Sequence, residues 1–155
     1  MKNSIIILLL FFTISSFSQP GDSAVLFFNK GMQEMSARRY LVASNEFNEA
    51  IRINPLYSEA YLHNGFANKE MRRTDAAKMN FAKAYELDNK NEKAVSELVE
   101  IFYNYRQYQQ AIDFAQKCNS CKDKDRIIAM SYFQMEDYGK AEKTLLKVIE
   151  KDPQD

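Results

Sequence analysis

The chain has 155 residues, of which 46% are hydrophobic and 27% charged, so it can build a core and is not a disordered tail. Its 21 basic and 21 acidic residues balance, which excludes the strong positive field of a dedicated nucleic-acid-binding protein. Four glycines and three prolines are too few for a turn-dense sandwich or barrel, and one histidine with two cysteines offers little for metal or triad chemistry. We expect one mostly helical domain that is not an enzyme and holds no cofactor or metal.

The first segment, residues 1–18, has the pattern of a secretory signal peptide. Lys2 is followed by eight consecutive apolar residues at 5–12, and small residues lead up to Ser18. An uncleaved anchor is the alternative, but crossing ~30 Å of hydrocarbon takes ~20 apolar residues, more than this run supplies. We expect cleavage after Ser18, a short linker over 19–23, and export to the periplasm or outside the cell, in a bacterial envelope.

The remainder of the chain repeats every 34 residues. Gly31 and Gly65 are 34 positions apart, and three further pairs keep that interval: Ala43 and Ala77, Phe47 and Phe81, Ala50 and Ala84. A fixed period of this length is typical of a stacked solenoid. The chain then divides into four units, of which the third is shorter because it lacks its closing turn: 24–57, 58–91, 92–121 and 122–155.

Each unit predicts two helices. The first helix carries a packing stripe at i, i+3, i+4 and i+7, which is rather polar in the first two units and apolar in the third: Val95, Leu98, Val99 and Phe102. The second helix carries small and apolar residues with helical spacing. Pro55 and Pro153 end the first and fourth units, because proline does not continue a helix. One such pair cannot hide its apolar side alone, so stacking must supply the stability.

These positions give the chain a resemblance to tetratricopeptide repeat proteins over residues 24–155. The first unit resembles the repeat through seven residues: Phe27, Gly31, Tyr40, Ala43, Phe47, Ala50 and Pro55. The second unit matches through five: Tyr61, Gly65, Ala77, Phe81 and Ala84. The third and fourth units depart, with Val99 and Ala129 in place of glycine and Ala115 in place of the large aromatic residue. The resemblance implies an all-α, right-handed superhelical solenoid of about four antiparallel helix pairs, whose concave surface holds peptides or partner proteins.

Positions 5, 9 and 12 of each unit cluster on the side of the first helix that would line this groove. Eight of the twelve are apolar or aromatic: Phe28, Met32, Met35, Leu62, Phe66, Tyr103, Met130 and Phe133. The other four are Lys69, Ser96, Glu100 and Arg126. This excess predicts a groove for a protein or peptide with an apolar segment. Alternatively, the stripe packs against an extended segment at 19–23.

The resemblance also carries a negative expectation. Some tetratricopeptide repeat proteins grip a free C-terminal carboxylate with lysine and asparagine side chains at groove positions of consecutive units. Phe28 and Met32 stand where that grip would need polar groups. We therefore expect no such clamp in this chain.

The two cysteines form a C-x-x-C sequence at the end of the third unit. Cys118 takes the place of Ala50 and Ala84, which predicts a small buried residue, and Cys121 falls in the shortened turn. Export would permit a structural disulfide here, while free thiols and redox or metal chemistry are the alternatives. The lone His63 has no catalytic partner at a suitable spacing and is predicted to be a surface residue.

The last predicted helix is apolar where earlier units are polar or small. Leu146 takes the place of Asn48, Ala82 and Gln116, and Ile149 lies near it. Terminal repeats normally present a polar outer face. The pattern therefore favours self-association, a docking edge for a partner or a chain shorter than its parent, with a tolerated exposed leucine as the alternative.

Together these features predict an exported, non-enzymatic interaction module that holds a partner's peptide or helix in its groove and scaffolds a larger complex. A second hypothesis is a structural subunit that forms a homo-oligomer through its C-terminal helix. A third is a thiol–disulfide accessory acting through Cys118 and Cys121. We expect no nucleic-acid partner and no membrane span after signal cleavage.

Overall fold

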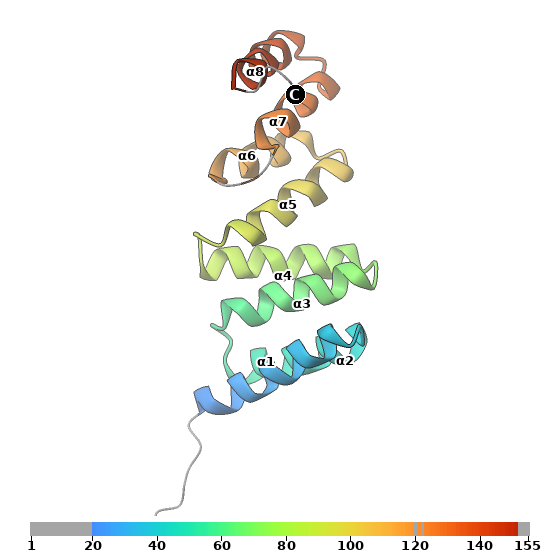
Figure 1. Cartoon of the computed structure of the whole chain (residues 1–155), viewed down its shortest axis with the longest axis vertical. Coiled ribbons are helices and arrows are strands. Elements are labelled where there is room, and N and C mark those ends of the chain that lie inside the picture. Colours follow the sequence, from blue (N-terminus) through green and yellow to red (C-terminus); the bar gives the residue numbers. More distant parts are fainter. Residues whose placement is uncertain (1–19, 120, 122, 152–155) are drawn as a thin grey trace, which may run out of the picture.

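The computed structural model describes residues 20–119, 121 and 123–151, and these residues form eight α-helices. In chain order the helices are α1 (Pro20–Ser36), α2 (Tyr40–Ile53), α3 (Ser58–Glu70), α4 (Thr74–Leu87), α5 (Glu92–Asn104), α6 (Tyr108–Lys117), α7 (Lys124–Gln134) and α8 (Tyr138–Lys151). Each even-numbered helix turns back on the helix before it, and the four resulting pairs stack along one axis (Figure 1). The predicted all-α solenoid of four antiparallel helix pairs is thereby confirmed.

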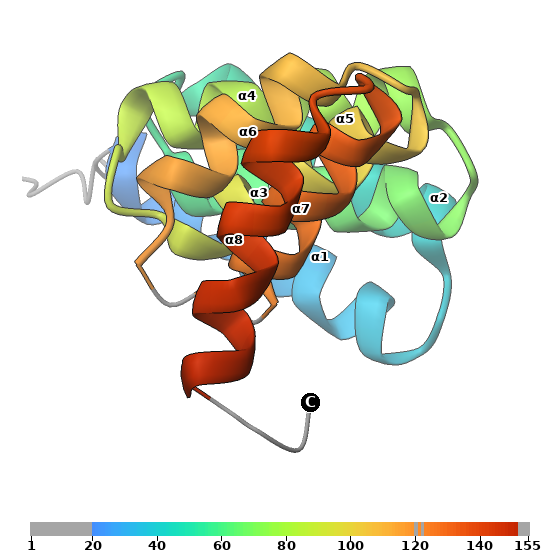
Figure 2. The same cartoon turned by 90° about the horizontal axis from the view of Figure 1, so that it is seen from above.

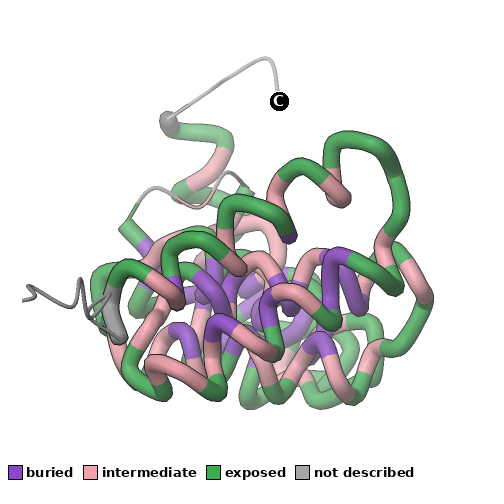
Figure 3. The backbone as a smooth tube through the Cα atoms, turned by 90° about the horizontal axis from the view of Figure 1, so that it is seen from below, coloured by how far each residue is buried: buried purple, intermediate pink, exposed green. Residues whose placement is uncertain are grey.

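The helices pack mainly on their neighbours in the chain, with α3 between α2 and α4 and α5 between α4 and α6. The core is consequently continuous along the stack and has no single centre. Buried positions run through the interior of the stack, and exposed positions lie on its outside (Figure 3). None of the helices in the described ranges is long and apolar enough to cross a bilayer.

The turn inside each unit is closed by a residue with left-handed backbone. Arg38, Arg72 and Arg106 have φ values of 58°, 57° and 59°. The N–H of Arg38 donates to the carbonyl of Met35, and the next N–H, that of Arg39, donates back across the helix end, so the turn is a Schellman motif. Left-handed backbone costs a residue other than glycine roughly 1–2 kcal/mol, which the closure of the helix pair must offset. Nothing in the sequence pattern pointed to this conformation, since glycine is the usual residue there.

The start of the chain was predicted to hold a signal peptide and a short linker. Residues 20–23, predicted to be a linker, form the first turn of α1 instead. They do not run as an extended strand beside the first helices, so the alternative in which such a segment covers the apolar stripe is wrong. The signal peptide predicted for residues 1–18 lies outside the described residues.

Candidate functional site

The predicted groove residues of the first unit are half-buried. Phe28, Met32 and Met35 project from α1 and pack against a cluster that contains Phe47 and Ala67. Phe47 comes from α2 and Ala67 from α3, so these three side chains bridge the first and second helix pairs. The partial burial leaves only part of each side chain for a partner.

The middle of the predicted groove is likewise tied into the core. Leu62 is buried, and Phe66 and Tyr103 are half-buried against the cluster that contains Phe81 and Leu98. The rings of Phe66 and Phe81 meet edge to face with centroids 5.2 Å apart. In this section of the stack the apolar stripe is part of a core cluster to which α3, α4 and α5 all contribute.

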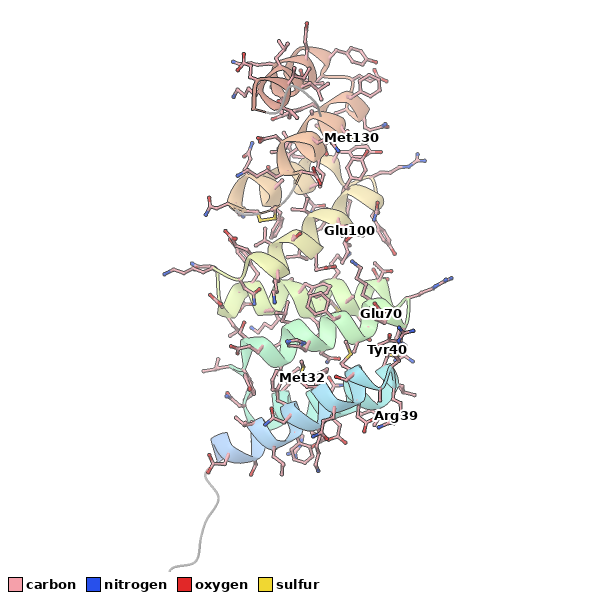
Figure 4. The ribbon with its side chains drawn as sticks, in the orientation of Figure 1. Met32, Arg39, Tyr40, Glu70, Glu100 and Met130 are labelled. Atoms are coloured by element: carbon pink, nitrogen blue, oxygen red, sulfur yellow. A yellow bond between two sulfur atoms is a disulfide. The ribbon has the colours of Figure 1, made fainter. Side chains whose placement is uncertain are left out.

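The last two groove residues are open to solvent. Met130 is 44% exposed and Phe133 is 57% exposed on α7. With Ala129, Gln134 and Leu145 they line a cavity of about 260 Å³ between α7 and α8. Figure 4 shows Met32, Glu100 and Met130 at successive levels of the stack, on α1, α5 and α7. The accessible apolar part of the stripe therefore lies at its C-terminal end.

An ion pair interrupts the apolar stripe at mid-length. Lys69 Nζ, from α3, donates to Glu97 Oε2 at 2.6 Å and to Glu100 Oε2 at 2.8 Å, both on α5. Partial burial works against the lysine charge, but the hydrogen bonds to Glu100 and Glu97 outweigh it, so the pKa of Lys69 is raised. A ligand lying along the stripe would meet charged groups at this level.

His63 lies between aromatic rings, and its predicted surface position is wrong. Its ring centroid is 5.5 Å from that of Phe28 and 5.9 Å from that of Phe66, so it fills the seam between the first two units. Burial lowers the pKa of His63, the positive charge of Lys93 lowers it further, and Glu59 partly opposes both. The imidazole is therefore a packing group that resists protonation.

A buried polar network fixes α2 against α3. Ser44 Oγ donates to Asn64 Oδ1 at 2.7 Å, and Asn64 Nδ2 donates to Asn48 Oδ1 at 2.7 Å. Asn68 Nδ2 donates to the carbonyl of Asn64 at 2.8 Å. Because buried polar groups are costly without partners, this network favours one register of the two helices. The sequence signal for it was the polar character of the packing stripe in the second unit, which contains Asn64 and Asn68.

Cys118 and Cys121 are joined by a disulfide, one of the three interpretations left open by the sequence. Cys118 is fully buried in the cluster that contains Ile112 and Ile128, and its carbonyl accepts a hydrogen bond from Lys124 Nζ at 2.8 Å. Reactive thiols are normally accessible thiolates, so this position suits a structural brace that closes the short helix α6. In the portion of the chain that the structure describes, no three His, Cys, Asp or Glu residues are arranged to hold a metal ion.

The two predicted edge residues, Leu146 and Ile149, are 54% and 52% exposed on α8. They belong to a surface here called the end face, which consists of Phe133, Tyr138, Ala141, Leu145, Leu146 and Ile149. With Glu142 at the rim, these residues line a cavity of about 400 Å³. The end face adjoins the smaller cavity beside Met130, because Phe133 and Leu145 line both.

Comparison with known proteins identifies the repeats. Residues 58–91 and 127–155 match the family described as tetratricopeptide repeat. Among solved structures, MamA from Desulfovibrio magneticus RS-1 has a TM-score of 0.74 at 18% identity, over 87% of this chain and 78% of that one. The Sgt2 TPR domain from Aspergillus fumigatus has a TM-score of 0.62 at 19% identity, over 75% of this chain and 81% of that one.

A curated relative adds similarity in sequence. Heat shock protein STI1 of Saccharomyces cerevisiae is 34% identical over 87 residues, which is 56% of this chain. The chain spans only 15% of the length of that protein. Two segments of the chain thus match the tetratricopeptide repeat family, and the chain shares the solenoid fold of the solved structures.

Proposed function

We propose that this chain is a non-enzymatic interaction module that holds an apolar peptide or helix of a partner protein along the stripe of its first helices and thereby scaffolds a larger complex. The observation that carries the proposal is the open cavity of about 260 Å³ beside Met130 and Phe133. Exposed apolar patches of this kind mark interaction surfaces. Methionine adapts its shape to an inserted side chain, and an aromatic ring supplies a large contact area.

The structure also suggests how a ligand would lie. An apolar anchor of the partner would enter the cavity between α7 and α8, where Leu145 forms part of the wall. Towards the middle of the stack, the ligand would pass the exposed Glu100 and its ion pair with Lys69. We therefore expect a partner segment with apolar residues at one end and polar or basic residues further along.

Export belongs to the same proposal. Lys2, the apolar run at 5–12 and the small residues up to Ser18 support a leader cleaved after Ser18. The disulfide between Cys118 and Cys121 supports an oxidising compartment such as the periplasm or the cell exterior. N-terminal sequencing of the protein from fractionated cells would give Gln19 as the first residue, and an intact Met1 in the soluble cytosolic fraction would overturn export.

Binding is tested with a library of fluorescent apolar peptides and amphipathic helices. The parent chain should bind a subset, and Met130→Glu should weaken that binding about tenfold or more, because a charge would enter an apolar cavity. Met79→Glu is the matched control, since Met79 is 71% exposed on α4 and lies outside this cavity. Equal weakening by both variants, or no binding by the parent, would contradict the proposed groove.

Self-association through α8 is a second candidate function. It is favoured by the exposure of Leu146 and Ile149 on the end face. Neither of these two residues lines the Met130 cavity, although the two surfaces share Phe133 and Leu145.

A further inference from the structure

Exposed apolar side chains gather at the C-terminal end of the stack. Of the fourteen large hydrophobic residues that are exposed in the described part of the chain, seven lie at or between Met130 and Ile149. Viewed from that end, α8 is nearest the viewer, and no described helix covers it (Figure 2). A single exposed leucine needs no explanation, but a contiguous patch of this kind indicates an interaction surface.

Part of this exposure follows from position in the stack. Phe81 is fully buried between α3 and the following pair, whereas its counterpart Leu145 is 42% exposed because no described helix follows α8. Leu146 is different. Its counterparts Asn48, Ala82 and Gln116 are polar or small, and Asn48 accepts a hydrogen bond from Asn64 of the following pair. A large apolar residue at this position indicates an apolar contact at the end face.

A second copy stacked head to tail is a poor fit for this surface. Such a copy would place its α1 where the next first helix of the solenoid would lie. At the positions where α5 presents Leu98 and Ile101 to the preceding pair, α1 carries Lys30 and Gln33. Burying these side chains against apolar residues would leave their polar groups without partners. Lys30 and Gln33 therefore disfavour this arrangement, although Leu26 on the same side of α1 is 54% exposed.

Two copies of the end face, in contrast, match each other. Lys143 and Glu150 are exposed and seven residues apart, so they lie on the same edge of α8, two helical turns from each other. The side chains of Lys143 and Glu150 form no hydrogen bond or ion pair with another residue in the described ranges. If two α8 helices pack antiparallel about a two-fold axis near Leu146, Lys143 of each copy faces Glu150 of the other. This charge pattern is self-complementary, as a two-fold interface requires.

We propose that the end face is the interface of a homodimer in which α8 of one copy packs antiparallel on α8 of a second copy. Leu146 and Ile149 of each copy cover the cavity of about 400 Å³ on the other, and two Lys143–Glu150 ion pairs flank the apolar contact. The full chain has 21 basic and 21 acidic residues, and loss of Lys2 with the leader leaves a net charge of −1, so two copies repel each other only weakly at long range. This inference rests on the second candidate function and does not require ligand binding at Met130.

The first experiment is sedimentation of the protein purified from the exported fraction, over a range of concentrations. The parent should dimerise, and Leu146→Glu should raise the dissociation constant about tenfold or more by placing a charge in the apolar contact. Met79→Glu, again an exposed site on α4, is the control and should leave the dimer unchanged. A parent that remains a monomer at the highest concentration would overturn the proposal. This holds also if the monomer binds an amphipathic helix of another protein through Leu146.

The second experiment tests the antiparallel arrangement by charge reversal. Lys143→Glu and Glu150→Lys should each weaken the dimer several-fold at low salt, because like charges would face each other across the axis. The double variant Lys143→Glu/Glu150→Lys should regain the parent's dissociation constant. If the double variant instead dimerises more weakly than either single variant, the antiparallel arrangement is wrong. Circular dichroism melts establish that each variant is folded. Met130→Glu should retain the dimer even where it loses ligand binding. The dimer and the ligand-binding groove can therefore be disproved independently of each other.

Discussion

Gly65 lies so close to the ring of Phe81 that a Cβ at position 65 would come within 2.5 Å of the ring atom Cε1. The contact joins α3 to α4 and recurs between α1 and α2 in the first unit. In the third unit Val99 and Ala115 occupy the two positions in one buried cluster. The large and small partners are thus exchanged, which conserves volume. The third unit therefore departs from the repeat pattern at two positions at once, and the larger residue on its first helix compensates for the smaller residue on its second.

The first prediction concerns this contact. Gly65→Ala should lower the free energy of unfolding by about 1–3 kcal/mol, because the fully buried Phe81 ring cannot move aside. Urea denaturation measures the change. Gly139→Ala is the matched control, since a Cβ there meets nothing within 4 Å, and it should be neutral or slightly stabilising.

The swap itself provides the stricter test. Phe81→Ala alone should cost about 3–5 kcal/mol through a cavity. The double variant Gly65→Val/Phe81→Ala, which copies the third unit, should be more stable than the sum of its two single changes. Strict additivity would contradict the size-matched packing.

The second prediction concerns the polar network between α2 and α3. Asn64→Leu copies the apolar residue Leu98 of the third unit, yet it should destabilise the chain by about 1–3 kcal/mol because Ser44 and Asn48 would lose their partner. Chemical denaturation checks the change, with Asn45→Ala on the exposed side of α2 as the control. An Asn64→Leu variant as stable as the parent would show that the network contributes nothing to the seam.

The third prediction is a pH dependence from His63. Burial and the charge of Lys93 hold its folded pKa below the ordinary value of 6.5. Acidification below that value therefore protonates the unfolded chain first and destabilises the fold, by at most about 1.4 kcal/mol per pH unit. Above about pH 7.5 the group contributes no pH dependence.

The measurement for His63 is the difference in unfolding free energy between the parent and His63→Phe, from about pH 8 to about pH 5. The aromatic replacement keeps a ring beside Phe28 and Phe66, while carboxylate contributions cancel in the difference. We expect the parent to lose stability relative to the variant below about pH 6.5. A constant difference across the range would contradict the lowered pKa.

The fourth prediction concerns the disulfide. Reduction of the Cys118–Cys121 bond should destabilise the chain by about 2 kcal/mol, a modest effect because the closed loop is short. Denaturation with and without reductant measures it, and Cys118→Ala/Cys121→Ala should be insensitive to reductant. If that double variant remains folded but loses partner binding, the result favours the thiol–disulfide accessory hypothesis over a purely structural disulfide.

The sequence predicted the helices well because their periodicity is local. The interval between Gly31 and Gly65, with the matching alanines, was enough to divide the chain into helix pairs. It did not reveal the left-handed turn at Arg72, since that conformation is imposed by the closure of the pair on a residue that does not prefer it. It also misplaced His63, because a half-buried position depends on the rings that two different helices bring to it.

The pattern of residues within each unit determined which side of each helix is apolar, and therefore the solenoid. Only the tertiary structure decided which apolar residues a partner can reach. Met32 and Met130 occupy the same position of their units, yet Met32 is half-buried against the next pair and Met130 is exposed. The physical reason is that helical periodicity is encoded within one unit, whereas exposure depends on what the neighbouring unit presents.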